Sequence, residues 1–228
     1  YGADFKTGRD SLKFNNYSVK YSDDIMEWQW TELLSKAGHD AVSIYRLLSS
    51  RLRENAVCFG MAAFMQQLNR DVLSAPQFGA HTSSEITKTA QVKSTIAYYH
   101  LAQYLPQFRK ADYVDRIKSQ ADLAEEIVTA LVTEATPVIV NLKESESAST
   151  PAWIGAGHTV LAYAVDAFSD ESNYIVYIAD SNSMVSVFRS VNVGTSSYFN
   201  YPSIMLVNKK TYSIVDYTMY PVTKDTAP

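Results

Sequence analysis

The stretch Asn55-Ala56-Val57-Cys58-Phe59-Gly60-Met61-Ala62-Ala63-Phe64 places the only cysteine of the 228 residues at the start of an apolar run. Apolar residues continue at helical spacing beyond it, which predicts a helix from Cys58 to about Leu68 or Arg70. A chain with one cysteine forms neither an internal disulfide nor a thiolate metal site. Cys58 is therefore either a small buried core residue or a nucleophile, and the rest of the sequence must distinguish the two.

Two later segments supply the residue types that a nucleophilic cysteine needs. Residues 157–163, Gly-His-Thr-Val-Leu-Ala-Tyr, predict a strand that opens on His158. Residues 174–182, Tyr-Ile-Val-Tyr-Ile-Ala-Asp-Ser-Asn, predict a strand that closes on Asp180 and Asn182. If the two strands pair as a hairpin, the end of the second lies beside the start of the first, and Asp180 falls near His158.

The order of thiol, imidazole and carboxylate along the chain is that of a thiolate–imidazolium site. The unsatisfied N–H groups and the dipole at a helix N-terminus favour the thiolate of Cys58. An imidazolium at His158 lowers the thiol pKa further and can protonate a leaving amine. Asp180, with Asn182 as the second choice, can accept the other ring N–H and fix the tautomer.

Helical patterns fill the first part of the chain and strand patterns the second. Residues 1–22 are polar and irregular, with a short strand expected near Leu12–Phe14. Residues 23–220 are expected to form one domain, with a helical half over 23–135 and a β half over 136–220. Helices are predicted at 23–36, 40–53, 58–70, 84–105 and 113–134, and strands at 137–142, 158–165, 174–179, 184–188, 203–207 and 212–216. The predicted fold class is therefore α+β, with the helical half facing a mostly antiparallel sheet.

The composition is that of a folded protein, with 46% apolar and 19% charged residues. A formal net charge of -4 leaves no basic surplus for phosphates, which argues against nucleic acid and anionic membrane surfaces as partners. No apolar run reaches the roughly 18 residues of a membrane-spanning helix, and neither HExxH nor another paired His/carboxylate spacing indicates a metal. Abundant tyrosine with a single cysteine favours a secreted bacterial protein. No cofactor is expected.

The segment Cys58-Phe59-Gly60-Met61-Ala62 and the strand over 157–163 together resemble the papain-like cysteine peptidases. Within that family they look like the bacterial branch related to the bacteriocin-processing C39-like peptidases. The resemblance runs from roughly Asp23 to Asp216 and implies a papain-like fold acting on a peptide or protein substrate. It makes Cys58 the nucleophile, His158 the general base and acid, and Asp180 the orienting residue.

The sequence departs from the papain-like pattern just before the cysteine. These enzymes usually carry a glutamine there, whose side-chain amide completes the oxyanion hole. Residues 49–55, Ser-Ser-Arg-Leu-Arg-Glu-Asn, contain no glutamine, so Asn55 is the candidate oxyanion donor, with a helix N-cap as its alternative role. Trp153, in the loop before His158, either borders the substrate groove or anchors that loop.

Three functions remain open. The first is a peptidase that hydrolyses peptide bonds through a thioester acyl-enzyme, and the second is an acyl or amide transferase that uses the same three residues. The third is a papain-like binding module with little or no turnover, which the missing glutamine favours. Residues 221–228 are expected to begin a linker to further modules of the same polypeptide, and that linker or a pro-segment is a candidate occupant of the groove.

Overall fold

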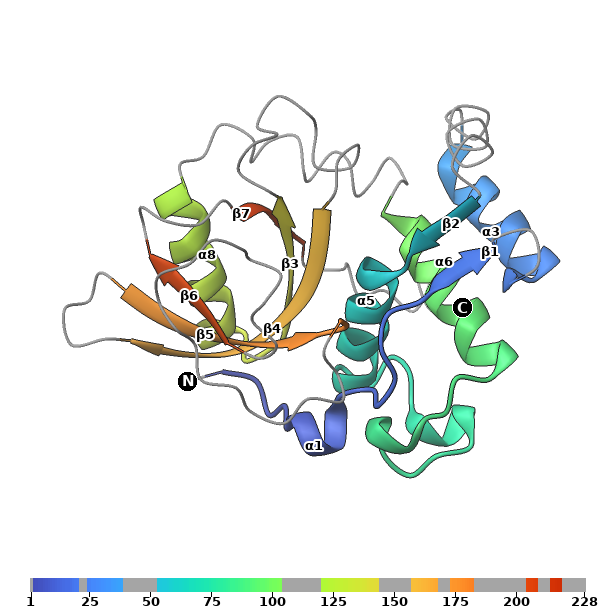
Figure 1. Cartoon of the computed structure of the whole chain (residues 1–228), viewed down its shortest axis with the longest axis horizontal. Coiled ribbons are helices and arrows are strands. Elements are labelled where there is room, and N and C mark those ends of the chain that lie inside the picture. The colour runs from blue at the N-terminus through green and yellow to red at the C-terminus, as the bar shows by residue number, and fades with distance from the viewer. Residues whose placement is uncertain are drawn as a thin grey trace.

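The computed structural model describes residues 2–20, 24–38, 53–103, 120–143, 157–167, 173–182, 204–208 and 214–218. Within them the chain is α+β, as predicted, with helices packed against an antiparallel sheet (Figure 1). The helices are α1 (Thr7–Asp10), α3 (Glu27–Ala37), α5 (Cys58–Asn69), α6 (Ala90–Ala102) and α8 (Gln120–Thr133), with 3-10 turns η2 (Ala75–Phe78) and η3 (Ser83–Glu85). The strands are β1 (Ser18–Lys20), β2 (Arg53–Ala56), β3 (Val138–Lys143), β4 (Gly157–Ala167), β5 (Asn173–Asp180), β6 (Ile204–Asn208) and β7 (Ile214–Thr218). None of the described helices combines the length and the apolar character needed to cross a membrane.

The main sheet has the strand order β6-β5-β4-β3-β7, and every neighbouring pair in it is antiparallel. β4 and β5 form the expected hairpin, with Val160 opposite Asp180 and Ala167 opposite Tyr174. β1 and β2 form a separate antiparallel pair, and β2 ends immediately before α5. The strand that carries the histidine and the strand that carries the acid are therefore direct neighbours.

The two faces of the main sheet bury different apolar sets. One face packs against Ile127 and Leu131 of α8 and carries alternate residues of three strands: Val138, Val140, Val160, Ala162, Val176 and Ile178. Ile139, Leu161 and Ala179 belong instead to the larger core that includes α5 and α6. Each of these three lies one residue from a member of the first set, because successive side chains of a strand point to opposite faces. α5 and α8 therefore cover opposite faces of the sheet.

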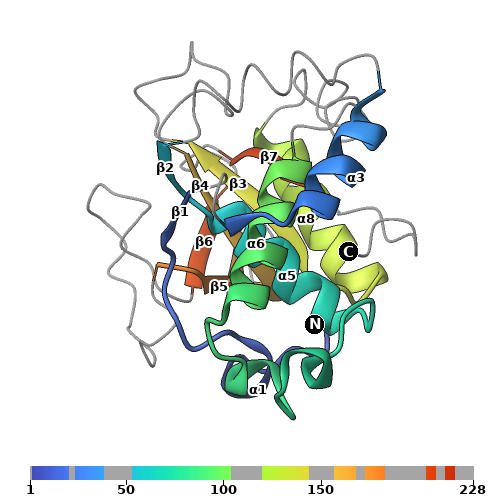
Figure 2. The same ribbon diagram turned by 90° about the vertical axis from the view of Figure 1, so that its right-hand side faces the viewer.

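α5 is the central helix of the helical half, and its residues 59–68 are all buried. It packs against β4 and β3 on one side and against α6 on another, so that both helices lie in front of the sheet in Figure 2. Gly60 permits the close approach to α6. A Cβ at this position would overlap the Ile96 carbonyl oxygen and lie 2.9 Å from His100 Cβ. A side chain at position 60 would therefore push α6 away from α5.

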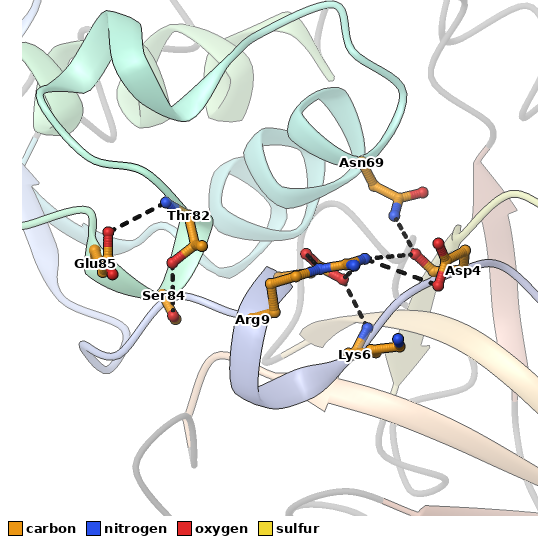
Figure 3. A network of polar contacts seen from close by, with 8 residues as sticks. Asp4, Lys6, Arg9, Asn69, Thr82, Ser84 and Glu85 are labelled. Carbon is orange, nitrogen blue, oxygen red and sulfur yellow. Dashed lines mark hydrogen bonds and ion pairs between the residues drawn. The ribbon is translucent and has the colours of Figure 1, made fainter.

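Residues 2–20, which we call the N-terminal strap, contact both halves of the molecule. The Phe5 ring stacks on Tyr163 of β4, with 4.9 Å between the ring centroids. Asn69, the last residue of α5, donates from Nδ2 to the Asp4 carbonyl oxygen at 3.2 Å (Figure 3). The strap therefore joins the sheet to the helix that carries Cys58 before it continues into β1.

The helix starts differ from the sequence predictions. The helix predicted from residue 84 begins at Ala90, because the Thr89 side chain accepts a hydrogen bond from the Val92 N–H and caps the helix there. The helix predicted from residue 23 begins at Glu27, after an extended residue at the N-cap position. Residues 40–52, 104–119 and 184–188, where the sequence predicts parts of three helices and a strand, lie outside the described residues.

The described part of residues 1–22 is irregular apart from two short elements, and the strand placed at Leu12–Phe14 is wrong. α1 and β1 form in this segment, and the strand lies at Ser18–Lys20. Arg53–Ala56, where the sequence predicts the end of a helix, forms β2. One cause explains the errors at both strands: β1 and β2 pair with each other, Ser18 opposite Ala56, across a long sequence separation that local spacing does not reveal.

Candidate active site

Cys58 is the first residue of α5 and is half-buried. The helix begins here because β2 ends at Ala56 and Val57 leaves the extended conformation, with φ -102 and ψ 33. The first N–H groups of an α-helix have no partner within the helix, and the Val57 side chain does not cap them. The thiol therefore lies at the positive end of the helix dipole, where its thiolate is favoured.

His158 and Asp180 lie on the neighbouring strands β4 and β5. Val160 is directly opposite Asp180, so His158, two residues earlier, lies on the same face of the sheet and diagonal to the acid. His158 Nε2 and Asp180 Oδ1 are 2.6 Å apart, and the two side chains are only 4% and 2% exposed. The predicted contact between the two residues is confirmed. With Nε2 bound to the carboxylate, Nδ1 is the ring nitrogen that remains for Cys58.

The thiol and the imidazole shift each other's pKa in directions that favour an ion pair. Burial raises the pKa of the Cys58 thiol, but the hydrogen bond and charge of His158, with hydrogen bonds from Thr159, outweigh burial and bring that pKa below its ordinary value. Burial lowers the pKa of His158, but hydrogen bonds with Asp180 and Cys58 and the charges of both raise it to about 9. Both shifts favour a Cys58 thiolate beside a His158 imidazolium.

Thr159 is a contact of Cys58 that the sequence analysis missed. Hydrogen bonds from its backbone and side chain are among the interactions that lower the thiol pKa. Thr159 Oγ1 also lies 2.7 Å from Asn141 Oδ1 of β3, within hydrogen-bond distance, and the two residues are opposite each other in the β3–β4 ladder. A sequence signal for this contact exists: Asn141 is a polar residue in the middle of an apolar strand.

Asn182 supports Asp180 and makes no hydrogen bond with His158. Its backbone N–H donates to Asp180 Oδ1 at 2.8 Å, and its exposed side chain accepts from Asn16 Nδ2 at 3.2 Å. Of the two residues considered for orienting the imidazole, Asp180 is therefore the one in contact with it. Asn16, which belongs to the N-terminal strap, is absent from the sequence prediction.

Two predicted site residues remain without a described side chain. Asn55 lies in β2 opposite Val19 of β1. Its alternative role as the N-cap of α5 is wrong, because Val57 occupies the N-cap position. Its role as an oxyanion donor stays a prediction. Trp153, predicted to border the groove, lies outside the described residues.

Of the other histidines, His81 and His100 are described, and neither is among the groups that shift the Cys58 pKa. His81 is exposed beside η3, and His39 lies outside the described residues. His100 is buried in α6, where burial lowers its pKa to about 4. In the part of the chain that the structure describes, no three His, Cys, Asp or Glu side chains are grouped so that they could hold a metal ion.

No protein-family model matches the sequence, and neither a curated protein nor a solved structure is significantly similar to it. What the described residues define is an α+β protein in which a cysteine at a helix N-terminus contacts a buried imidazole–carboxylate pair. Function must therefore be inferred from the chemistry of these groups.

Proposed function

We propose that the protein is a cysteine peptidase that uses Cys58, His158 and Asp180. The observation that carries this proposal is the buried 2.6 Å contact between His158 and Asp180 beside a cysteine at the start of a helix. A buried ion pair costs desolvation energy that apolar side chains of the same volume would avoid. Titratable groups whose pKa values are shifted by burial and by specific charge partners are concentrated at functional sites.

In the proposed acylation step, the Cys58 thiolate attacks the carbonyl carbon of the peptide bond. The C–N bond breaks as the His158 imidazolium gives a proton to the leaving amine, which leaves a thioester on Cys58 and a neutral imidazole. His158 then takes a proton from water as the water oxygen attacks the thioester carbonyl. The carboxylic acid departs, the sulfur leaves as thiolate, and the imidazolium is restored. Asp180 stays ionised and holds the ring through Nε2–H.

The negative oxygen of the tetrahedral intermediates needs N–H donors. The backbone N–H of Cys58, at the start of α5, is the first proposed donor, and Asn55 is the second. We also propose that the fold is papain-like and that the substrate is a peptide or protein. The packing of α5, which carries the thiol, against a sheet whose adjacent strands carry the imidazole and the acid supports the fold proposal.

Alkylation of Cys58 tests the proposal directly. Wild-type protein and His158→Ala are treated with iodoacetamide or an epoxysuccinyl probe between pH 5 and 8. This range lies below the unperturbed pKa of a thiol, about 8.5, so an ordinary cysteine is mostly protonated in it. Mass spectrometry locates the adduct. We expect rapid labelling of wild-type Cys58 at acidic pH. Labelling of His158→Ala should be slower by roughly 10²-fold or more, because the thiolate loses its counter-ion.

A peptide library then separates the remaining functions, with Cys58→Ala as the control. Cleavage by the wild type and not by Cys58→Ala supports the peptidase. Product formation only with an added amine acceptor indicates an acyl transferase. Labelling that rises only toward the pH of a free thiol, with no cleavage, overturns the enzymatic proposal in favour of a binding module.

A further inference from the structure

Asn16 of the N-terminal strap lies between the two segments that carry the candidate catalytic groups. Its side-chain Oδ1 accepts a hydrogen bond from the backbone N–H of Val57 at 2.9 Å, and Val57 directly precedes Cys58. Its own backbone N–H donates to the Ser181 carbonyl oxygen at 2.6 Å, and Ser181 directly follows Asp180. One residue therefore contacts the chain neighbours of both the thiol and the acid.

The other end of the Asn16 amide completes a continuous hydrogen-bonded path. Nδ2 donates to Asn182 Oδ1 at 3.2 Å, and the Asn182 N–H donates to Asp180 Oδ1 at 2.8 Å. That same oxygen of Asp180 contacts His158 Nε2 at 2.6 Å. The path runs from the backbone next to Cys58, through Asn16 and Asn182, to the carboxylate that holds the imidazole.

The path requires an amide at position 16. Oδ1 accepts from two backbone N–H groups, those of Val57 and Tyr17, at 2.9 and 3.0 Å, while Nδ2 donates to Asn182. The two N–H donors fix which end of the amide is the oxygen. An aspartate lacks the donor, and an aliphatic side chain lacks both donor and acceptor.

The geometry points to Asn16 as a positioning residue that sets the distance between Cys58 and the His158–Asp180 pair. This role rests on the proposed function, since it matters only where the thiol and the imidazole react together. The thiol is carried by the helical half and the imidazole by the sheet, so their separation depends on what joins the two halves. A displacement of about 1 Å in a reacting group can lower a rate by roughly 10²-fold.

The strap offers a matched control. Asn69 also donates a side-chain amide N–H across the interface between the strap and α5, to the Asp4 carbonyl oxygen at 3.2 Å. This bond (Figure 3) lies at the last residue of α5, whereas Cys58 is the first residue of that helix. Asn69→Ala therefore removes a strap contact of the same kind without touching the path to Asp180.

The experiment measures the rate of Cys58 alkylation by iodoacetamide from pH 5 to 9 in five proteins: wild type, Asn16→Ala, Asn182→Ala, the Asn16→Ala/Asn182→Ala double variant and Asn69→Ala. We expect Asn16→Ala to label roughly 10- to 100-fold more slowly at pH 5–6, with its pH midpoint moved toward that of an ordinary thiol. Asn182→Ala, whose side chain is exposed and whose loss is compatible with folding, should show a smaller shift in the same direction. The Asn16→Ala/Asn182→Ala double variant should lose no more than Asn16→Ala alone, and Asn69→Ala should keep the wild-type profile.

A second readout separates failure of this inference from failure of the proposed function. If wild-type Cys58 labels as an ordinary thiol, the peptidase proposal fails, and the NMR signal of the proton between His158 and Asp180 still reports on Asn16. That signal should move or broaden in Asn16→Ala and Asn182→Ala and stay unchanged in Asn69→Ala. The positioning role is overturned if neither the NMR signal nor the labelling profile changes in Asn16→Ala. It is also overturned if both change as much in Asn69→Ala as in Asn16→Ala.

Discussion

His100 and His158 are both buried imidazoles, yet their surroundings move their pKa values in opposite directions. His100 in α6 is 6% exposed and His158 in β4 is 4% exposed. Burial lowers the pKa of His100 to about 4. For His158, burial acts in the same direction, but Asp180 and Cys58 outweigh it and raise the pKa to about 9. The comparison teaches that the partner, and not the degree of burial, decides which imidazole is charged at neutral pH.

The two histidines lie on either side of the first turn of α5. His158 contacts Cys58, the first residue of the helix, while His100 packs against Gly60 two residues later. The neutral imidazole lies where two helices come closest, and the charged imidazole lies where the helix meets the sheet. Only two residues of α5 therefore separate the contact of a histidine used for packing from the contact of a histidine that we propose for chemistry.

The largest expected effect comes from making His158 resemble His100. Asp180→Asn keeps the volume of the side chain and removes its charge, so only Cys58 is left to oppose burial and the His158 pKa should fall well below about 9. We expect peptide hydrolysis at neutral pH to fall roughly 10²- to 10⁴-fold. NMR titration of the imidazole and kcat/KM measure the two effects, with the exposed Asp71→Asn as control. A His158 pKa that stays near 9 would contradict the account.

His100 should affect stability rather than activity. Because its folded pKa of about 4 lies below the ordinary 6.5, only the unfolded chain binds a proton between these values. The stability it contributes is present above pH 6.5 and is lost as the pH falls toward 4, by roughly 3 kcal/mol in all. His100→Gln should remove this part of the pH dependence, as measured by urea unfolding at several pH values. His81→Gln, at an exposed position, is the control. If the free energy of unfolding depends on pH in the same way in wild type, His100→Gln and His81→Gln, the result would argue against a buried neutral His100.

The smallest effect tests the packing that buries His100. Gly60→Ala places a methyl group against the Ile96 carbonyl oxygen and His100, so we expect a loss of about 1–3 kcal/mol in the free energy of unfolding. Separation of α5 from α6 should also raise the His100 pKa toward 6.5. Gly8→Ala is the matched control, because nothing lies within 4 Å of the added Cβ in α1. Equal free energies of unfolding in the two variants would show that α6 can move away from α5 without loss of stability.

The hairpin and the contact between His158 and Asp180 could be predicted because local pattern decides both. β4 and β5 carry alternating apolar residues that belong to two cores on opposite faces of the sheet. His158 lies at the start of β4, and Asp180 lies at the end of β5. Antiparallel pairing then brings those two ends together. The start of α5 at Cys58 could be predicted for a similar reason, since its apolar run is long and its spacing is helical.

Asn16 and β2 could not be predicted, because what defines them lies far away in the sequence. Asn15 and Asn16 follow Phe14 in a polar segment that has the composition of an ordinary loop. Arg53–Ala56 has no apolar alternation of its own and is a strand because β1 lies beside it. A hydrogen bond between residues 16 and 182 leaves no periodic trace in either segment.

The order of the site residues along the chain also sets when the site can form. Asp180 follows Cys58 by more than half of the 228 residues. At a synthesis rate of about 5–20 residues per second, on the order of ten seconds separates the appearance of the thiol from that of its distant partner. Until β5 pairs with β4, Cys58 has no His158–Asp180 pair beside it and stays an ordinary thiol. The thiol of a nascent chain should therefore stay unactivated until the residues from Cys58 to Asp180 have all been made.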